Sequence, residues 1–162
     1  MKTIRHFHGG ARQRGLAMVE MAITLPLLLF LLVGTTELGR AFYQYTALTK
    51  AVRDGARYAA EAVVDNTGKI DLALATENGS SITQNVQSLV VYGTTAGGAP
   101  PLLPGLVPGN VVLSAVDAVH VRVVANYTFQ SMFGGTIPSF GVGGGDLQSP
   151  VTLTASATMR GL

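Results

Sequence analysis

The feature that most constrains this chain is a long apolar run near its N-terminus. From Leu16 to Thr36 the only charged residue is Glu20. Because a helix rises about 1.5 Å per residue, about 20 such residues cross the roughly 30 Å hydrocarbon core of a bilayer. A buried helix of a soluble domain would carry a polar face, and Leu25–Val33 has none. The run therefore predicts a transmembrane helix over residues 16–39.

The charges around this run are asymmetric. Residues 1–15 contain four basic residues and no acidic one, namely Lys2, Arg5, Arg12 and Arg14. Because positive charge is retained on the cytoplasmic side of a membrane, we expect the N-terminus in the cytoplasm and the chain after Gly39 outside. The net charge of +2 thus reflects a short basic head. It does not indicate nucleic-acid binding.

A cleaved secretory signal peptide is the main alternative for the apolar run. Such peptides have an apolar region of about 7–15 residues that ends in a small-x-small cleavage site. Here the run is longer and passes into GRAFYQYTALTKAV, residues 39–52, which continues a helical pattern. The sequence therefore favours a helix that is retained.

The same helix is predicted to continue as an amphipathic segment over residues 40–64. Apolar residues recur there every three or four positions, which indicates one buried stripe. The stripe consists of Leu38, Phe42, Tyr45, Leu48, Val52, Ala56, Ala59 and Val63. Charged residues fall mostly off the stripe, and Arg57 has Asp54 and Glu61 at helical spacing. One continuous helix from Leu16 to Val64 is expected.

Residues 65–162 are predicted to form a small domain of the α+β class. Asp65–Gly68 has turn chemistry, and Ile70, Leu72 and Leu74 form a short strand or a helical turn. A second helix is expected from Ser80 or Ser81 to about Val91, with Ile82, Val86 and Leu89 on one face. Strands are expected at Val111–Val116, His120–Phe129 and Val151–Arg160, with loops at 93–110 and 131–149. The apolar stripe of the long helix is expected to cover this antiparallel sheet.

Glu20 is the most informative single residue. A carboxylate inside an apolar span costs several kcal/mol unless it is neutralised or paired. One interpretation is an acid that reaches back toward the headgroups. The other is that the carboxylate has a functional partner.

The segment Arg14–Glu20, RGLAMVE, resembles a type IV prepilin cleavage site, in which a glycine is followed five residues later by glutamate. Together, GLAMVEMAITLPLLLFLLVGTTELGR (residues 15–40) and AVRDGARYAA (residues 51–60) resemble TadE-like minor pilins, or pseudopilins, of tight-adherence (Flp-type) pili. The resemblance implies that a prepilin peptidase removes residues 1–15 as a cytoplasmic leader by cutting between Gly15 and Leu16. It also implies a type IV pilin-like fold, with a single span in the bacterial inner membrane and residues 40–64 and 65–162 in the periplasm.

By the same resemblance, the mature protein supports pilus assembly and adhesion. Its expected partners are other minor pilins, the major Flp pilin and the pilus assembly platform. A cut before Leu16 would place a new ammonium group near the Glu20 carboxylate, and the two charges attract strongly where the dielectric is low. Leu16 stands where many pilins have Phe or Met, and the chain is longer than the short major Flp pilins. The greater length favours a minor or accessory subunit.

Further candidate residues would act through helix packing, and they are Pro26, Gly34, Gly39, Arg53, Gly55 and Arg57. Pro26 removes a backbone hydrogen bond, which either bends the helix for packing or is a harmless kink. Gly34 and Gly39 permit close helix approach. Gly55 costs about 1 kcal/mol relative to Ala in a helix, so we expect a close partner, either the chain's own sheet or another subunit. For the two arginines a salt-bridged exposed face is the alternative.

No catalytic residue, metal site or cofactor is predicted, and the chain is not expected to be an enzyme. It has no cysteine, and its histidines, His6, His8 and His120, show no metal-ligand spacing. His120 has no apparent partner in the sequence. The alternative to a pilus subunit is an uncleaved single-pass anchor whose outer domain binds a partner or ligand, but that alternative leaves Gly15, Glu20 and RDGARYAA unexplained.

Overall fold

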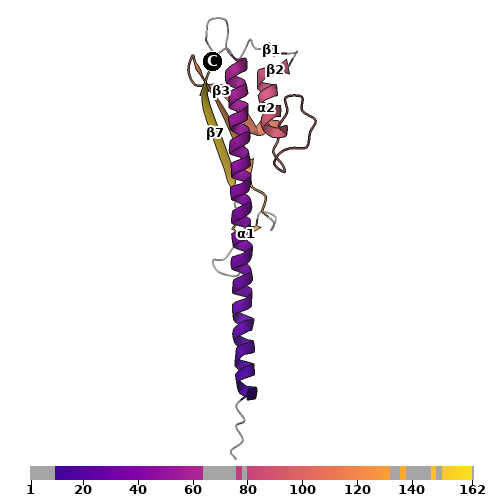
Figure 1. Ribbon diagram of the computed structural model, residues 1–162, viewed down its shortest axis with the longest axis vertical. Coiled ribbons are helices and arrows are strands. Elements are labelled where there is room, and N and C mark those ends of the chain that lie inside the picture. Colours follow the sequence, from indigo (N-terminus) through magenta and orange to yellow (C-terminus); the bar gives the residue numbers. More distant parts are fainter. Residues whose placement is uncertain are drawn as a thin grey trace, which may run out of the picture. The chain divides into compact units, whose positions relative to one another are not determined.

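The computed structural model describes residues 10–63, 76–77, 80–131, 136–137, 147–148 and 151–161 (Figure 1). The chain divides into two compact units, Met1–Gly39 and Arg40–Leu162. Each is described by itself below.

The first unit contains most of a single long helix, α1, which runs over Gly10–Ala62 and includes Pro26 (Figure 1). The helix begins before the expected Leu16 and ends close to the expected Val64. The earlier start has a simple cause, because Ala11, Arg12, Gln13 and Arg14 are all strong helix formers.

The second unit is built on a three-stranded antiparallel sheet in the order β3-β4-β7. Its strands are β3 (Val111–Ala115), β4 (His120–Thr128) and β7 (Thr152–Arg160). The central β4 pairs along its whole length with β7, from His120 opposite Arg160 to Thr128 opposite Thr152. Side chains alternate across β4 as predicted, and the buried set is Val121, Val123, Ala125 and Tyr127.

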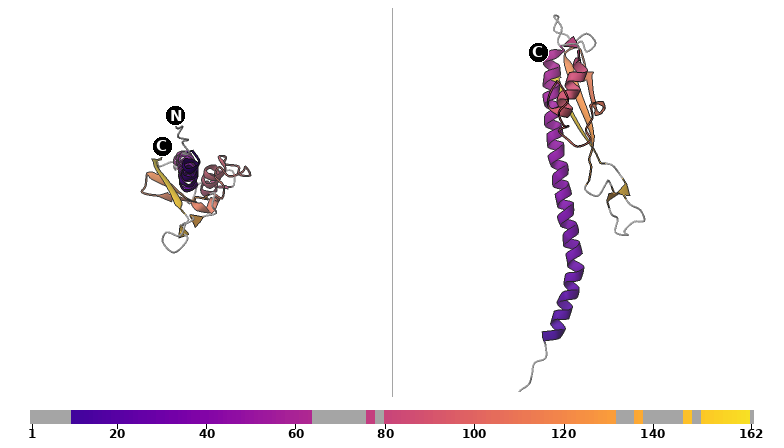
Figure 2. Two further views of the ribbon diagram at one scale, coloured as in Figure 1. Left: turned by 90° about the horizontal axis from the view of Figure 1, so that it is seen from below. Right: turned by 90° about the vertical axis from the view of Figure 1, so that its right-hand side faces the viewer.

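Two helices cover the buried face of this sheet. The part of α1 from Arg40 onward lies beside α2 (Ile82–Tyr92), and both lie on the same side of the sheet (Figure 2). Leu48 and Val52 of α1 belong to one hydrophobic cluster with Val121 and Val123 of β4. The predicted α+β arrangement, with the long helix over the sheet, is therefore confirmed. The second helix shares that cover.

The predicted stripe of α1 is right in its upper part and wrong at its start. Leu48, Val52, Ala56, Ala59 and Val63 are buried as expected, whereas Leu38, Phe42 and Tyr45 are exposed. Gln44 takes the buried position in that turn, and its Oε1 has no hydrogen-bond partner among the described residues. Positions 44 and 45 both lie about one helical turn before Leu48, so helical spacing allows either of them to face the core, and in the structure position 44 does.

The second helix differs from expectation at its N-terminus. Ser81 is the N-cap of α2, but its side chain makes no capping hydrogen bond. Its backbone is extended and pairs in the short strand β2 (Ser80–Ser81) with β1 (Thr76–Glu77). The buried residues of α2 are Ile82, Val86, Val90 and Val91, while Leu89, which was predicted to lie on the buried face, is only partly buried. Gly93 ends the helix in the left-handed conformation, φ 75°, where glycine is favoured.

The two glycine-rich segments contain more order than a plain loop. Residues 93–110 include the 3-10 turn η1 (Pro108–Asn110), and Leu103 and Leu106 are buried in the core. Within the predicted loop at residues 131–149, the short strands β5 (Thr136–Ile137) and β6 (Leu147–Gln148) pair, which was not predicted from the sequence. The predictions for Asp65–Gly68 and Ile70–Leu74 lie outside the described residues.

Candidate functional site

The candidate site in the first unit is the apolar surface of α1. Every described side chain from Gly15 to Leu32 is exposed. α1 is long enough and apolar enough to cross a membrane, and none of its most apolar window is buried. Exposed leucines at this density are unusual on a water-facing surface, so this part of the helix is a candidate membrane span.

The threonines of this segment satisfy their own hydroxyl groups. Each donates its Oγ1 hydrogen to the carbonyl four residues earlier: Thr24 to Glu20 at 2.9 Å, Thr35 to Leu31 at 2.6 Å and Thr36 to Leu32 at 2.9 Å. A hydroxyl bonded in this way needs no water. The polar atoms of these side chains are therefore compatible with a hydrocarbon environment, where unpaired donors are costly.

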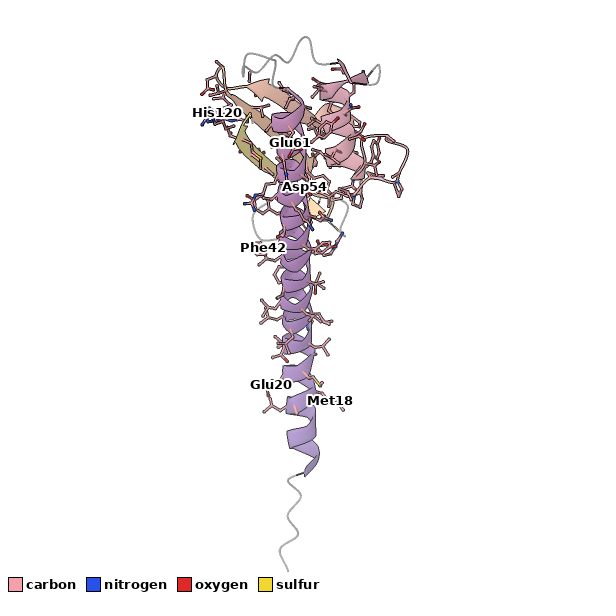
Figure 3. The ribbon with its side chains drawn as sticks, turned by 45° about the horizontal axis from the view of Figure 1, so that its top comes forward. Met18, Glu20, Phe42, Asp54, Glu61 and His120 are labelled. Atoms are coloured by element: carbon pink, nitrogen blue, oxygen red, sulfur yellow. The ribbon has the colours of Figure 1, made fainter. Side chains whose placement is uncertain are left out.

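Glu20 is the exception on this surface. Its side chain is exposed, and within the described part of the chain its carboxylate has no hydrogen-bond or ion-pair partner (Figure 3). Gly15 lies five residues earlier in α1, and a Cβ placed there would meet nothing within 4 Å. The structure thus leaves both the predicted junction and the acid open to another molecule.

The other candidates in the first unit are equally open. A Cβ at Gly34 or Gly39 would also meet nothing within 4 Å. Pro26 lies inside α1, where its ring leaves the carbonyl four residues earlier without its usual donor. The described residues of this chain supply none of these three positions with a close helix partner.

Gly55 has a partner, and it is a helix of the same chain. A Cβ at this position would stand 2.5 Å from Val90 Cγ2 and 3.6 Å from Val86 Cγ1, both on α2. The sequence left open the chain's own sheet or another subunit as the partner of Gly55, and the observed contact is instead with α2. The glycine lets α1 and α2 approach closely, which explains its place in a helix that it otherwise weakens.

The arginines beside Gly55 face solvent. Arg53 is exposed, and Arg57 Nε lies 3.2 Å from Glu61 Oε1 in a pair whose side chains are 77% and 53% exposed. Such a pair contributes a few tenths of a kcal/mol at most. Arg57 therefore fits the salt-bridged exposed face, with Glu61 rather than Asp54 as its partner, and Arg53 is exposed.

Arg40, the first residue of α1 in the second unit, contacts the residues that follow β4. Its guanidinium carbon lies 5.9 Å from the centre of the Phe129 ring, and its Nη2 donates to Gln130 O at 3.4 Å. Both distances lie near the upper limits for contacts of their kind.

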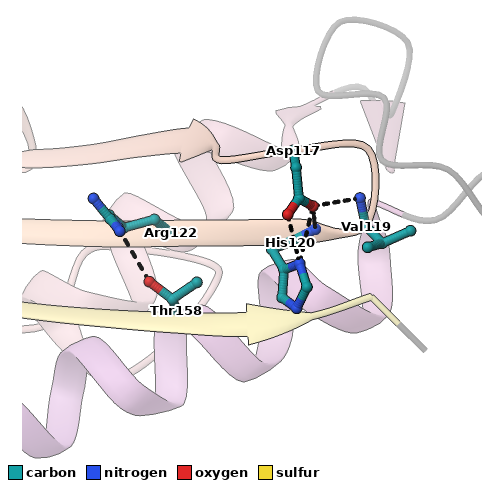
Figure 4. Close-up of polar contacts among 5 residues, drawn as sticks. All are labelled: Asp117, Val119, His120, Arg122 and Thr158. Carbon is teal, nitrogen blue, oxygen red and sulfur yellow. Dashed lines mark hydrogen bonds and ion pairs between the residues drawn. The ribbon is translucent and has the colours of Figure 1, made fainter.

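His120 has a partner that sequence reasoning missed. Its Nδ1 lies 2.9 Å from both carboxylate oxygens of Asp117, and Asp117 Oδ1 also accepts the backbone N–H groups of Val119 and His120 (Figure 4). The Val119 N–H above all, and then the His120 side chain, hold the pKa of Asp117 below its ordinary value. The group ties the turn between β3 and β4, and the Asp in that turn was the available signal.

Comparison with known proteins agrees with the resemblance in the first unit. Residues 15–57 match the model of a family described as TadE-like protein, and this match confirms the predicted resemblance over that segment. No curated protein and no solved structure matches the chain. The match begins at Gly15 and ends at Arg57, two residues beyond the glycine that contacts α2.

Proposed function

We propose that this chain is a minor pilin, or pseudopilin, that supports the biogenesis of a tight-adherence pilus. The TadE-like match associates the chain with this machinery. In the proposal, α1 spans the bacterial inner membrane once, with the basic residues 1–15 in the cytoplasm and the sheet-bearing unit in the periplasm. The role is structural and not enzymatic.

The observation that carries the proposal is that the family match starts at Gly15 and is followed, at Glu20, by a carboxylate with no partner among the described residues. A prepilin peptidase would hydrolyse the Gly15–Leu16 bond, with water supplying the new carboxylate of Gly15 and the new amine of Leu16. At neutral pH that amine is an ammonium group. It is the one new cation that processing would place close to Glu20.

Gly15 suits such a cut. It lies within α1, so the helix must open locally before the peptide bond can enter a protease. Glycine weakens a helix by about 1 kcal/mol relative to alanine, and its missing side chain leaves the bond unobstructed.

Assembly would then follow from the physics of the exposed span. Glu20 is costly in lipid alone, and the Leu16 ammonium of the same or a neighbouring chain compensates it when helices bundle. Gly34 and Gly39, which are open in this chain, would allow a neighbouring helix to approach closely. The partners would be other minor pilins, the major Flp pilin and the assembly platform.

Intact mass of the protein recovered from membranes tests the proposal. In cells that contain the prepilin peptidase, the chain should begin at Leu16, and in cells that lack it the chain should retain Lys2 to Gly15. Gly15→Val should block the shift, whereas Gly34→Val, the same change elsewhere in the span, should not. A chain that keeps its leader in peptidase-positive cells would instead favour an uncleaved anchor with a ligand- or partner-binding outer domain.

A further inference from the structure

Three exposed aromatic side chains gather in one turn of α1 in the second unit. Phe42 (labelled in Figure 3), Tyr43 and Tyr45 have exposed fractions of 63%, 76% and 44%. The other described aromatic residues of this unit are buried or partly buried, and they are Tyr58, Tyr92, Tyr127 and Phe129. Aromatic rings carry a large apolar area, so exposed rings confined to a single turn indicate a surface that is covered in the working protein.

The turn lies in an uncharged stretch of helix. Between Arg40 and Lys50 no residue is charged, although charged residues are frequent in α1 from Lys50 onward. The side of this stretch that faces away from the core therefore offers rings and phenol hydroxyls to its surroundings and no ionised group.

The threonines of this stretch repeat the pattern of the apolar segment. Thr46 Oγ1 donates to Phe42 O at 2.9 Å, and Thr49 Oγ1 donates to Tyr45 O at 2.8 Å. Because both hydroxyl hydrogens are used within the helix, moving this surface out of bulk water leaves no threonine donor unpaired.

We propose that Phe42, Tyr43 and Tyr45 form an interfacial anchor that lies among phospholipid headgroups and fixes the depth of the second unit at the membrane. The proposal rests on the proposed function, in which α1 spans the bilayer. Phe42 follows Thr36, the end of the uncharged run, by less than two helical turns of sequence. Tyrosine, with an apolar ring and a polar tip, is enriched at membrane–water interfaces.

The spread of the rings favours lipid over a partner helix. At about 100° per residue, Tyr45, Phe42 and Tyr43 cover an arc of about 160° around α1. A partner helix binds a narrow stripe of residues at i, i+3, i+4 and i+7. A fluid headgroup layer surrounds the helix and contacts the whole arc.

Because the chain contains no tryptophan, a single substitution gives a unique fluorescent reporter. We would reconstitute full-length Tyr43→Trp in vesicles of phosphatidylethanolamine and phosphatidylglycerol. Quenching would be measured with aqueous acrylamide and with lipids that carry a nitroxide in the headgroup or deep in the acyl chain. Leu28→Trp reports on the span, and Val112→Trp, an exposed apolar position on β3, reports on the outer domain.

We expect the headgroup nitroxide to quench Tyr43→Trp most, and acrylamide to quench it several-fold less than Val112→Trp. The acyl-chain nitroxide should quench Leu28→Trp most.

Three other outcomes would contradict the proposals. If acrylamide quenches Tyr43→Trp as strongly as Val112→Trp, while Leu28→Trp is still quenched mainly by the acyl-chain nitroxide, the membrane span is supported and the anchor is refuted. If Leu28→Trp is also open to acrylamide, the proposed function fails. If dilution of the protein in lipid removes the protection of Tyr43→Trp, a second copy of the chain covers the rings, which also refutes the anchor.

Tryptophan itself favours the interface, so a second arm leaves the reporter at Leu28→Trp and replaces Phe42, Tyr43 and Tyr45 by Ser. Loss of the anchor should broaden or shift the depth profile of the Leu28→Trp reporter. Replacing Val112 by Ser in the same background is the control and should leave that profile unchanged. An unaltered profile in the triple variant would contradict the proposal.

Discussion

Gly55 of α1 lies directly against Val90 of α2, so close that a Cβ at position 55 would stand 2.5 Å from Val90 Cγ2. Val90 is fully buried, and its β-branched side chain has few rotamers with which to withdraw. The close approach of the two helices therefore depends on the absence of a side chain at position 55.

We predict that Gly55→Ala destabilises the second unit by about 1–2 kcal/mol. The better helix propensity of alanine offers about 1 kcal/mol, but overpacking a tight core typically costs about 1–3 kcal/mol, and the short stiff neighbour places this site at the upper end. Thermal unfolding of the full chain in detergent, followed by circular dichroism, measures the effect. Gly39→Ala, the same change in the same helix with open space around it, should cause no loss. Equal melting temperatures for the two variants would contradict the contact.

The sheet could be predicted from the sequence because strand alternation has a period of two and appears directly in the residue order. Every second residue of β4 is apolar, and the observed pairing of Val121 with Met159 and of Tyr127 with Leu153 places those residues on one face. The residue order contains no comparable signal for the packing of α1 against α2. Gly55 indicates a close neighbour, but only the fold shows that the neighbour is α2.

The start of the amphipathic helix shows the limit of periodicity. Phe42 and Tyr45 were assigned to the core because they are apolar and correctly spaced, yet Gln44 is buried in their place. Helical spacing alone fits a buried stripe through position 44 as well as through position 45. Choosing the more apolar residue, Tyr45, gave the wrong prediction. In the proposed interfacial anchor the rings of Phe42 and Tyr45 contact lipid. Their hydrophobicity then reflects the membrane around the protein and not the core of the folded unit.

Gly15 and Glu20 were found from the sequence because the pattern is local, five residues apart along one chain. The Asp117–His120 pair was missed because it depends on the path of a turn. Asp117 lies three residues before His120, and only the observed backbone places the Val119 and His120 N–H groups on one carboxylate oxygen.

We predict that the turn held by Asp117 weakens in acid. The pKa of Asp117 is lowered in the folded state, first by the Val119 N–H, so its contribution to stability is present above the unfolded value near 4 and is lost as the pH falls through the lower folded value. Asp117→Asn keeps an oxygen acceptor but has no charge to lose. Both proteins keep His120, which lies opposite Arg160 in the sheet. The difference in melting temperature between wild type and Asp117→Asn should shrink as the pH is lowered from about 5, and a constant difference would count against this assignment.

We predict the opposite pH dependence at Tyr127. Burial raises the pKa of its phenol, and the nearby Arg40 charge offsets this only in part. The unfolded chain therefore releases this proton at a lower pH than the folded chain, and stability falls as the pH rises above about 10. At neutral pH Tyr127→Phe should be less stable by about 1 kcal/mol, because the hydroxyl donates to Pro104 O at 3.2 Å. Above about pH 10 that difference should narrow. Parallel stability curves for the two proteins would refute the prediction.

We predict that Glu20→Ala separates processing from assembly. The carboxylate has no partner in the described part of the chain, so removing it costs the isolated subunit nothing and should make its insertion in lipid easier. Cleavage after Gly15 should proceed, because the scissile bond does not depend on a charge five residues away. Assembly should fail, because the Leu16 ammonium would enter the helix bundle without its compensating charge, and leaving one member of a buried pair unpartnered costs about 3–5 kcal/mol. The measurements are intact mass for cleavage and surface piliation for assembly, with Glu61→Ala, an exposed acid far along α1, as the control. Normal pili assembled with the Glu20→Ala subunit would rule out the pairing, and an uncleaved Glu20→Ala chain would show that the acid acts in recognition by the peptidase.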